Sequence, residues 1–167
     1  MSESAGAAAS FRPPGPTLEH ELFKSDVGTW DVKIEINMAP GAPPQESKGV
    51  ARNRLACGGL WLIMEFLNET TCFEGHGIYG YDPAKGKYVG TWVDPMRTFL
   101  TISEGSYDSA TKTMTMWFEI AGPQGKSMKW REVTERKDDD TRVWRSIMKG
   151  ADGHEFEVMK ALYTRRK

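Results

Sequence analysis

The sequence has few residues of the types that most often carry chemistry, with two cysteines and three histidines in 167 residues. No CxxC or HxxxH spacing supports a metal site, and no GxSxG elbow supports a nucleophilic serine. No glycine-rich loop opens a helix as in dinucleotide-binding proteins. We expect Cys57 and Cys72 to be free thiols in a reducing compartment, with a single disulfide between them as the alternative.

An excess of one charge is also lacking. The 22 lysines and arginines nearly balance the 23 aspartates and glutamates, and no long basic run occurs. The sequence therefore lacks the basic patch expected of a nucleic-acid-binding protein. No run of about 18 apolar residues could span a membrane, and the N-terminus lacks the basic start of a signal peptide. We therefore expect a soluble cytoplasmic protein with neither nucleic acid nor membrane as a partner.

The composition divides the chain into a tail and one domain. Residues 1–16 are rich in Ala, Ser, Pro and Gly, which predicts a disordered N-terminal tail. Residues 17–167 suit a single domain large enough to bury a core.

A short helix is expected at the start of this domain. Thr17 can cap it, and Gly28 ends it. Its buried side would carry Leu18, Leu22 and Phe23.

Strand-like alternation follows the helix. From Trp30 to Met38, apolar residues alternate with polar and charged ones, as in a strand with one wet face. Turn signals such as DPAKGK and GPQG separate further short strands. The mixed-sign segment 136–142, RKDDDTR, is expected to be a solvated hairpin tip. The further strands are expected at 48–57, 60–67, 73–81, 87–94, 98–106, 113–120, 127–135, 142–149 and 155–164.

About ten strands joined by tight turns indicate an antiparallel meander. Open sheets leave unpaired edges, so the meander is expected to close on itself. The sequence thus predicts an all-β fold, a closed up-and-down barrel of about 8–10 strands with a short N-terminal helix. A β-sandwich is the alternative. A barrel of this size fills with side chains or holds one small ligand.

Six segments share a recognisable pattern: GTW (28–30), ACGGLWLIMEF (56–66), FEGHGIYGYD (73–82), KYVGTWVD (87–94), DG (152–153) and YTR (163–165). Together they resemble a bacterial lipocalin-like (calycin) family, domain of unknown function 1579, over residues 18–165. The resemblance implies a barrel with a cavity and carries no general activity. It also implies that Trp30 closes one end of the barrel near Arg165, with Arg166 next to it. An aliphatic residue is usual in this pattern where the chain has His76.

Glu65 and His76 are the candidate catalytic residues. Trp61, Ile63 and Glu65 share one face of their strand, which can point inward or outward. One register of the hairpin places Glu65 opposite Gly75, and the other places it opposite His76. The second register would set a carboxylate beside an imidazole, which suits proton transfer. The alternatives are an exposed Glu65 and a structural His76.

Aromatic and polar residues on the strands are the candidate ligand-binding group. Tyr88, Trp92 and Asp94 alternate on one face and could line a pocket with an aromatic wall. Packing of the barrel is the alternative for each of them. The full set of candidate ligand-binding residues is Trp61, Tyr79, Tyr81, Tyr88, Trp92, Asp94, Arg97 and Trp130.

Four functions are compatible with these residues. The first is binding of a small, largely apolar or aromatic molecule in the cavity. The second is a cofactor-independent acid–base enzyme, such as an isomerase, cyclase or lyase, using Glu65 and His76, with Tyr81 or Arg97 stabilising negative charge. The third follows from resemblance to the nitrobindins, lipocalin-like proteins that hold haem through one histidine, which would be His154 here. The fourth is a homodimer through exposed aromatic residues.

Overall fold

The computed structural model describes residues 13–39, 41–122, 125, 127–150 and 153–167. Within these residues, ten strands form one antiparallel meander that closes into a barrel, as the sequence predicts. The β-sandwich alternative is wrong. The tail predicted for residues 1–16 lies mostly outside the described residues. The strands are β1 (Gly28–Ile36), β2 (Gln45–Ala56), β3 (Trp61–Asn68), β4 (Glu74–Asp82), β5 (Lys87–Val93), β6 (Thr101–Asp108), β7 (Thr113–Ala121), β8 (Ser127–Arg136), β9 (Thr141–Lys149) and β10 (Glu155–Arg165).

Pairing of the first and last strands closes the barrel. Each strand pairs with its neighbour in the sequence, and β1 pairs with both β2 and β10. Trp30 lies opposite Ala51 on β2 and opposite Arg165 on β10. Closure leaves no open sheet edge among the described strands, which removes a template for aggregation.

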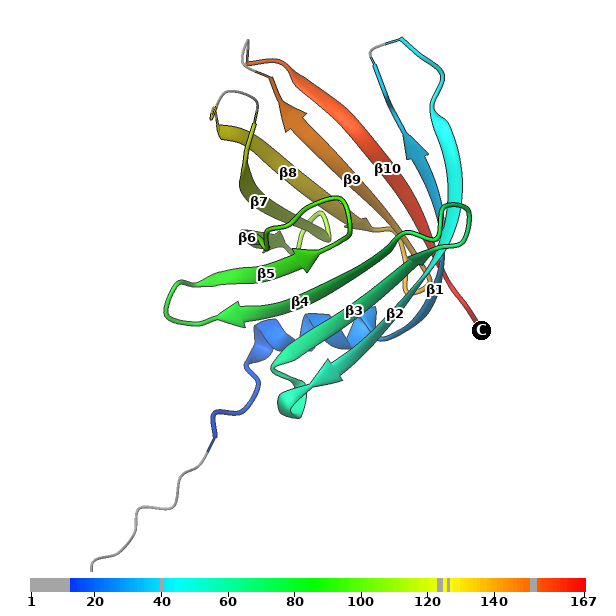
Figure 1. Cartoon of the computed structure of the whole chain (residues 1–167). Helices are drawn as coiled ribbons and strands as arrows, with labels where there is room; N and C mark the ends of the chain where they lie inside the picture. Colours follow the sequence, from blue (N-terminus) through cyan, green and yellow to red (C-terminus); the bar gives the residue numbers. More distant parts are fainter. Residues whose placement is uncertain (1–12, 40, 123–124, 126, 151–152) are drawn as a thin grey trace, which may run out of the picture.

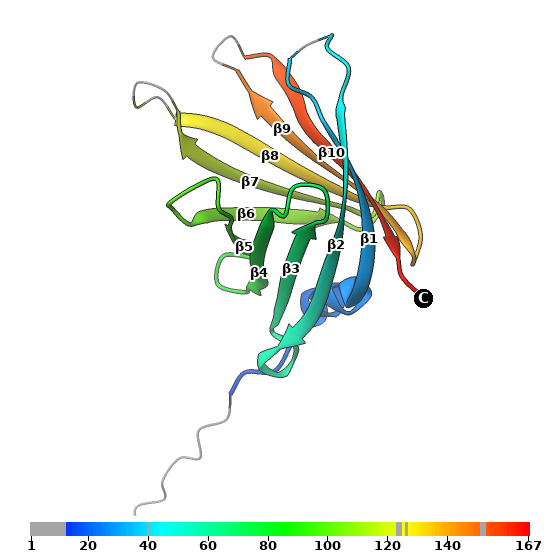
Figure 2. The same ribbon diagram turned by 45° about the vertical axis from the view of Figure 1, so that its right-hand side comes forward.

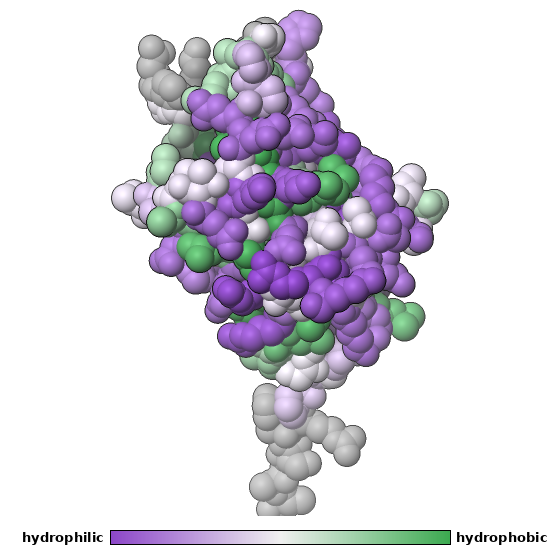
Figure 3. All heavy atoms as spheres, turned by 90° about the vertical axis from the view of Figure 1, so that its right-hand side faces the viewer, coloured by the Kyte–Doolittle hydropathy of each residue, from purple (hydrophilic) through white to green (hydrophobic). Residues whose placement is uncertain are grey.

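Alternation along the strands separates the inner and outer faces. On β1, Trp30, Val32 and Ile34 are buried, whereas Asp31 and Lys33 are exposed. The side of the barrel around β1 and β2 is covered largely by hydrophilic side chains (Figure 3).

A 3-10 helix, η1 (Leu18–Asp26), crosses one end of the barrel (Figures 1 and 2). Residues three apart share a face in such a helix, so His20, Phe23 and Asp26 are its buried residues. Phe23 is buried as expected, but Leu18 is 87% exposed, which corrects the prediction made for it. That prediction assumed the 3.6-residue period of an α-helix.

Trp30 forms the packed junction between η1 and the barrel. Its indole Nε1 donates a hydrogen bond to the Asp26 carbonyl oxygen at 3.0 Å. The guanidinium carbons of Arg165 and Arg142 lie 4.2 and 4.3 Å from its ring centroid. The contact between Trp30 and Arg165 confirms the packing that the resemblance implied. Arg166 points elsewhere and pairs with Asp31 on β1.

Cys57 and Cys72 are free and exposed, as expected, so the alternative of a disulfide between them is wrong. No helix among the described residues is long and apolar enough to cross a membrane.

Candidate functional site

A cavity of about 310 Å³ lies inside the barrel. Most of its wall consists of aromatic, aliphatic and methionine side chains, with a few charged groups between them. Such a composition is typical of small-molecule sites. The apolar lining residues include Phe23, Ile34, Leu62, Met64, Phe66, Phe73, Tyr79, Tyr88, Trp92, Met114, Met116, Phe118, Trp130, Trp144, Val158, Met159 and Tyr163.

Glycines on β4 and β5 allow the rings of Trp92 and Tyr79 to pack directly against the strand backbone. A Cβ at Gly75 would overlap the Trp92 indole, and a Cβ at Gly77 would overlap the Tyr79 ring. On the next strand, a Cβ at Gly90 would come within 2.6 Å of the same tyrosine ring. The glycines therefore allow both rings to lie close to the backbone, which explains the spacing of glycine in residues 73–82.

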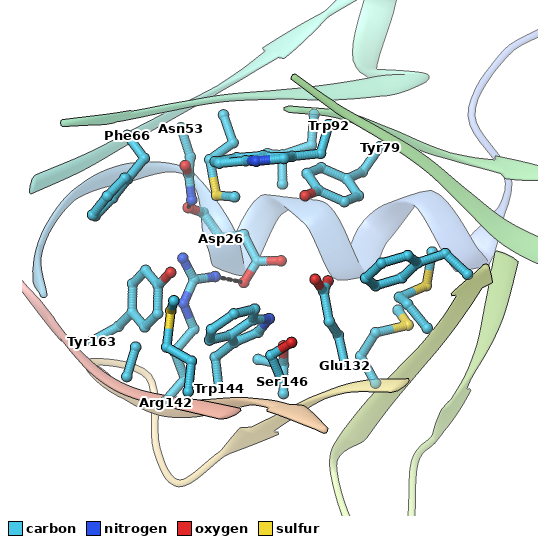
Figure 4. Close-up of a pocket in the computed structure, with 18 of the residues that line it drawn as sticks. Asp26, Asn53, Phe66, Tyr79, Trp92, Glu132, Arg142, Trp144, Ser146 and Tyr163 are labelled. Carbon is cyan, nitrogen blue, oxygen red and sulfur yellow. Dashed lines mark hydrogen bonds and ion pairs between the residues drawn. The ribbon is translucent and has the colours of Figure 1, made fainter. Parts of the chain in front are cut away.

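The floor of the cavity is a buried ion-pair cluster around Asp26 at the end of η1. Its carboxylate accepts hydrogen bonds from Arg136 on β8 and Arg142 on β9, each at 2.6 Å. Its backbone carbonyl accepts from Trp30, and from the Asn53 amide on β2 at 2.9 Å. The cluster thus ties η1 to four strands. Figure 4 shows the contact between Asp26 and Arg142.

Both arginines of the floor also stack on aromatic rings. Arg142 lies between Trp30 and Tyr163, with its guanidinium carbon 4.6 Å from the Tyr163 ring centroid. Arg136 lies 5.4 Å from the Tyr107 ring centroid, and its Nε and Nη1 atoms are buried without a hydrogen-bond partner among the described residues. The Nε and Nη1 groups of Arg136 are therefore enclosed by protein, and the Arg142 guanidinium is held between two rings.

Glu132 on β8 places a carboxyl group in the middle of the cavity. Figure 4 shows its side chain pointing inward between Trp144, Ser146 and Tyr79. Burial raises the pKa of Glu132 to about 7, although a hydrogen bond from Trp144 and the charge of Arg97 both lower it. The group can therefore gain or lose a proton near neutral pH.

Two buried tyrosines are electrostatically coupled to Glu132. Burial, followed by the charge of Glu132, raises the pKa of Tyr79 above its usual range. Burial also raises the pKa of Tyr163. Both phenols are therefore neutral hydrogen-bonding groups at physiological pH.

Asp94 and Arg97 lie at the end of the cavity away from η1. Tyr88, near the start of β5, donates a hydrogen bond to the Glu19 carbonyl of η1 at 3.1 Å, so the end of β5 points to the opposite rim. There the Asp94 carboxylate accepts from the Trp92 indole at 2.9 Å and lies 3.8 Å from the Arg97 guanidinium. This contact holds the Trp92 ring in place at the rim.

The family model described as protein of unknown function (DUF1579) matches residues 15–165. The chain belongs to the DUF1579 family. Among solved structures, it is similar to the crystal structure of Rv2717c from M. tuberculosis, with a TM-score of 0.63 and 12% sequence identity. That match covers 90% of this chain and 99% of the other, and it supports the fold alone at this identity. The comparison with curated proteins finds no match.

Six of the eight candidate ligand-binding residues line the cavity of this DUF1579 protein: Tyr79, Tyr88, Trp92, Asp94, Arg97 and Trp130. The other two do not line it. Trp61 is on the outer face and is 37% exposed. Tyr81 packs beside η1, where its ring makes edge contacts with His20 and Tyr88.

Glu65 and His76 lie directly opposite one another, in the second of the two registers considered for their hairpin. Both side chains are exposed on the outer face and neither lines the cavity. The exposed alternative for Glu65 is therefore confirmed, and the hypothesis that the pair works inside the cavity is wrong. The reason is that Leu62, Met64 and Phe66 form the inner face of β3, which leaves the other parity for solvent.

None of the three histidines lines the cavity of the DUF1579 barrel. His154, the candidate haem ligand, is exposed between β9 and β10. Within the described part of the chain, no group of three or more His, Cys, Asp or Glu residues could hold a metal ion.

Sequence reasoning missed Asp26, Glu132 and the two floor arginines. Arg136 and Arg142 are the first and last residues of the segment 136–142, which was expected to be a solvated hairpin tip. Both reach inward to Asp26, so that prediction is wrong for the two ends of the segment. One signal was present. Alternate residues of β8 share one face, and Trp130 on that face was already a candidate ligand-binding residue. The other residues on this face are Glu132, Thr134 and Arg136.

Proposed function

We propose that this protein binds a small, largely apolar or aromatic molecule inside its barrel. The observation that supports this best is the cavity of about 310 Å³ with an aromatic and methionine-rich wall. Its volume is at the lower end of the range of about 300–1,000 Å³ that is usual for ligand pockets. A ligand with one or two rings would suit this volume better than a long chain.

Binding of 2-naphthalenemethanol, followed by calorimetry or by ligand-observed NMR, tests the proposal. Met64 lines the cavity, whereas Ile63 on the same strand faces outward. A Met64→Trp variant should fill the cavity and weaken binding by about tenfold or more, and Ile63→Trp is the matched control with unchanged binding. Equal binding by the wild type and Met64→Trp would place the probe outside the cavity. Absence of binding by the wild type would contradict the proposal itself.

Glu132 favours acid–base catalysis as a second candidate function. A carboxyl with a pKa of about 7 inside an aromatic cavity meets the requirement of a general acid or base working near neutral pH. In this proposal Glu132 takes the role first given to Glu65 and His76, and the reaction classes remain isomerase, cyclase or lyase. Hydrogen exchange at the α-carbon of 2-tetralone in D2O, followed by NMR, tests for proton abstraction. Exchange that is equally fast with Glu132→Gln would rule this role out.

The homodimer stays a prediction. Large apolar side chains are exposed on the outer face of β4, β6 and β7, with exposed fractions of 46% for Ile78, 64% for Ile102 and 49% for Trp117. Exposed apolar side chains of this size would suit contact with a second copy. Sedimentation of the wild type and of Ile102→Lys would test it.

A further inference from the structure

The cavity lining contains three carboxylates, those of Asp26, Asp94 and Glu132, and two of them are already neutralised. Asp26 forms ion pairs with Arg136 and Arg142. Asp94 lies within ion-pair distance of Arg97. No ion pair joins Glu132 to a basic residue in the part of the chain that the structure describes; its hydrogen bond comes from the neutral Trp144 side chain.

Glu132 also has unused capacity to accept hydrogen bonds. An ionised carboxylate can accept about four hydrogen bonds, and Trp144 supplies one. The side chain keeps some accessible surface because it faces the cavity, and Figure 4 shows the carboxylate aimed toward its centre. A ligand that brings N–H donors to this point would complete the coordination of the carboxylate.

The rings on both sides of Glu132 suit a positive charge. Trp130 on the same strand stacks on Phe118, with centroids 6.0 Å apart and an interplanar angle of 10°. Trp144 and Tyr79 flank the carboxylate (Figure 4). Faces of Trp, Tyr and Phe attract an ammonium group, and the attraction is stronger where water is excluded.

We propose that the cavity selects a small aromatic or apolar molecule carrying a primary ammonium group, with Glu132 as the residue that binds the ammonium. The inference rests on the proposed function, because it names the class of ligand held in the same cavity. The ammonium supplies the positive charge and the N–H donors that the carboxylate lacks, and the aromatic wall receives the rest of the ligand.

A ligand with a carboxylate is the alternative suggested by the floor arginines. The geometry argues against it, because one Nη atom of each arginine is bonded to Asp26 and the Nε and Nη1 atoms of Arg136 are buried. A negative ligand would also approach the Glu132 carboxyl, which repels it when ionised.

Three matched probes test the inference: 2-naphthylmethylamine, 2-naphthalenemethanol and 2-naphthoate. They share one ring system and differ in charge. Calorimetry at pH 8 should show the amine binding about tenfold or more tightly than the alcohol, the size expected of a hydrogen-bonded charge pair. The Glu132→Gln variant should remove this preference and keep the affinity for the alcohol. Glu65→Gln, on the exposed outer face, is the control and should keep the preference.

A second measurement uses the wild type alone, so it does not depend on the folding of a variant. The charged and titratable groups facing Glu132 are Tyr79, Arg97, Arg142, Tyr163 and Asp26. Because burial raises the pKa of Glu132 to about 7, the carboxyl must lose its proton to pair with the amine. Affinity for the amine should therefore rise about tenfold from pH 6 to pH 8, while affinity for the alcohol stays level.

The outcomes separate this inference from the proposed function. Equal affinity for amine and alcohol, or tighter binding of naphthoate, would overturn the ammonium site while leaving small-molecule binding in place. An amine preference that survives in Glu132→Gln would also overturn it. If none of the three probes binds, the inference and the proposed function both fail.

Discussion

The indole of Trp92 lies against Gly75 on the neighbouring strand, so closely that a Cβ at Gly75 would overlap the ring. The glycine therefore sets the position of one cavity wall. Gly75→Ala should push the indole toward the cavity and cost about 1–3 kcal/mol of stability, as overpacking does. Urea denaturation and 2-naphthalenemethanol binding would both report the change. Gly15→Ala is the control, since nothing lies within 4 Å of that position.

Trp30→Ala should be strongly destabilising. The indole is 2% exposed, donates a hydrogen bond to η1 and lies between two guanidinium groups. Its removal should lower the free energy of unfolding by about 3–5 kcal/mol. Trp117→Ala is the matched control, because that indole is 49% exposed on the outer face and should cost about 1 kcal/mol or less. A loss of a few tenths for Trp30→Ala would contradict its role in closing the barrel.

Asp26→Ala should be more harmful than the loss of an exposed ion pair. The variant would leave Arg136 and Arg142 buried without their shared carboxylate, at a cost of about 3–5 kcal/mol. Asp31→Ala removes the exposed partner of Arg166 and should change stability by about 1 kcal/mol or less. Chemical denaturation of both variants at the same pH would compare them. Equal losses would mean that the floor cluster adds little to stability.

Glu132 should make stability fall as the pH rises. Burial raises its pKa from 4.5 to about 7 in the folded protein, so the folded state holds a proton that the unfolded state releases in this range. The stability associated with the neutral Glu132 carboxyl is fully present below pH 4.5 and is lost as the pH rises through about 7. The total loss in the free energy of unfolding is on the order of 3 kcal/mol. Urea unfolding from pH 4.5 to pH 8 should show a smaller decline for Glu132→Gln than for the wild type. Parallel curves would mean that the carboxyl is not buried in this way.

His76→Leu should leave both stability and cavity binding nearly unchanged. The imidazole is exposed on the outer face opposite Glu65, away from the cavity. Stability should stay within about 0.5 kcal/mol of the wild type. Calorimetry with 2-naphthalenemethanol should give the same affinity for both proteins. A tenfold weaker affinity would show that this outer pair acts on the cavity through the sheet.

The strand positions could be predicted from the sequence because turn residues mark their ends. Proline or glycine interrupts the alternation in six of the nine connections, and short polar segments mark the other three. The expected strands match the structure to within a few residues at their ends. The alternation in β1 also identified its inner face, because only every second residue, such as Trp30, Val32 and Ile34, is apolar. On β3 both parities are apolar, so the sequence left open whether Glu65 or Met64 points inward.

The charged residues of the cavity could not be found from the alternation of apolar and polar residues along the strands. On β8, Glu132 and Arg136 face inward while Arg131 and Glu135 lie on the other parity, so both faces carry charge. The rule that charge marks the wet face fails here, because Asp26 from a distant helix compensates the inward arginine. A partner that is remote in sequence has no local signature.

The pairing of β1 with β10 has a consequence for how the protein is made. The Asp31 and Arg166 side chains that meet across this seam are 135 residues apart in the sequence. On the ribosome, β1 emerges first and stays without its second neighbour until the last strand has been synthesised. During that interval the nascent chain exposes the apolar face of β1 and one unpaired edge, and both features favour aggregation. A chain truncated just before β10 should therefore bind chaperones or aggregate during translation. The full-length chain should do neither once β1 and β10 have paired.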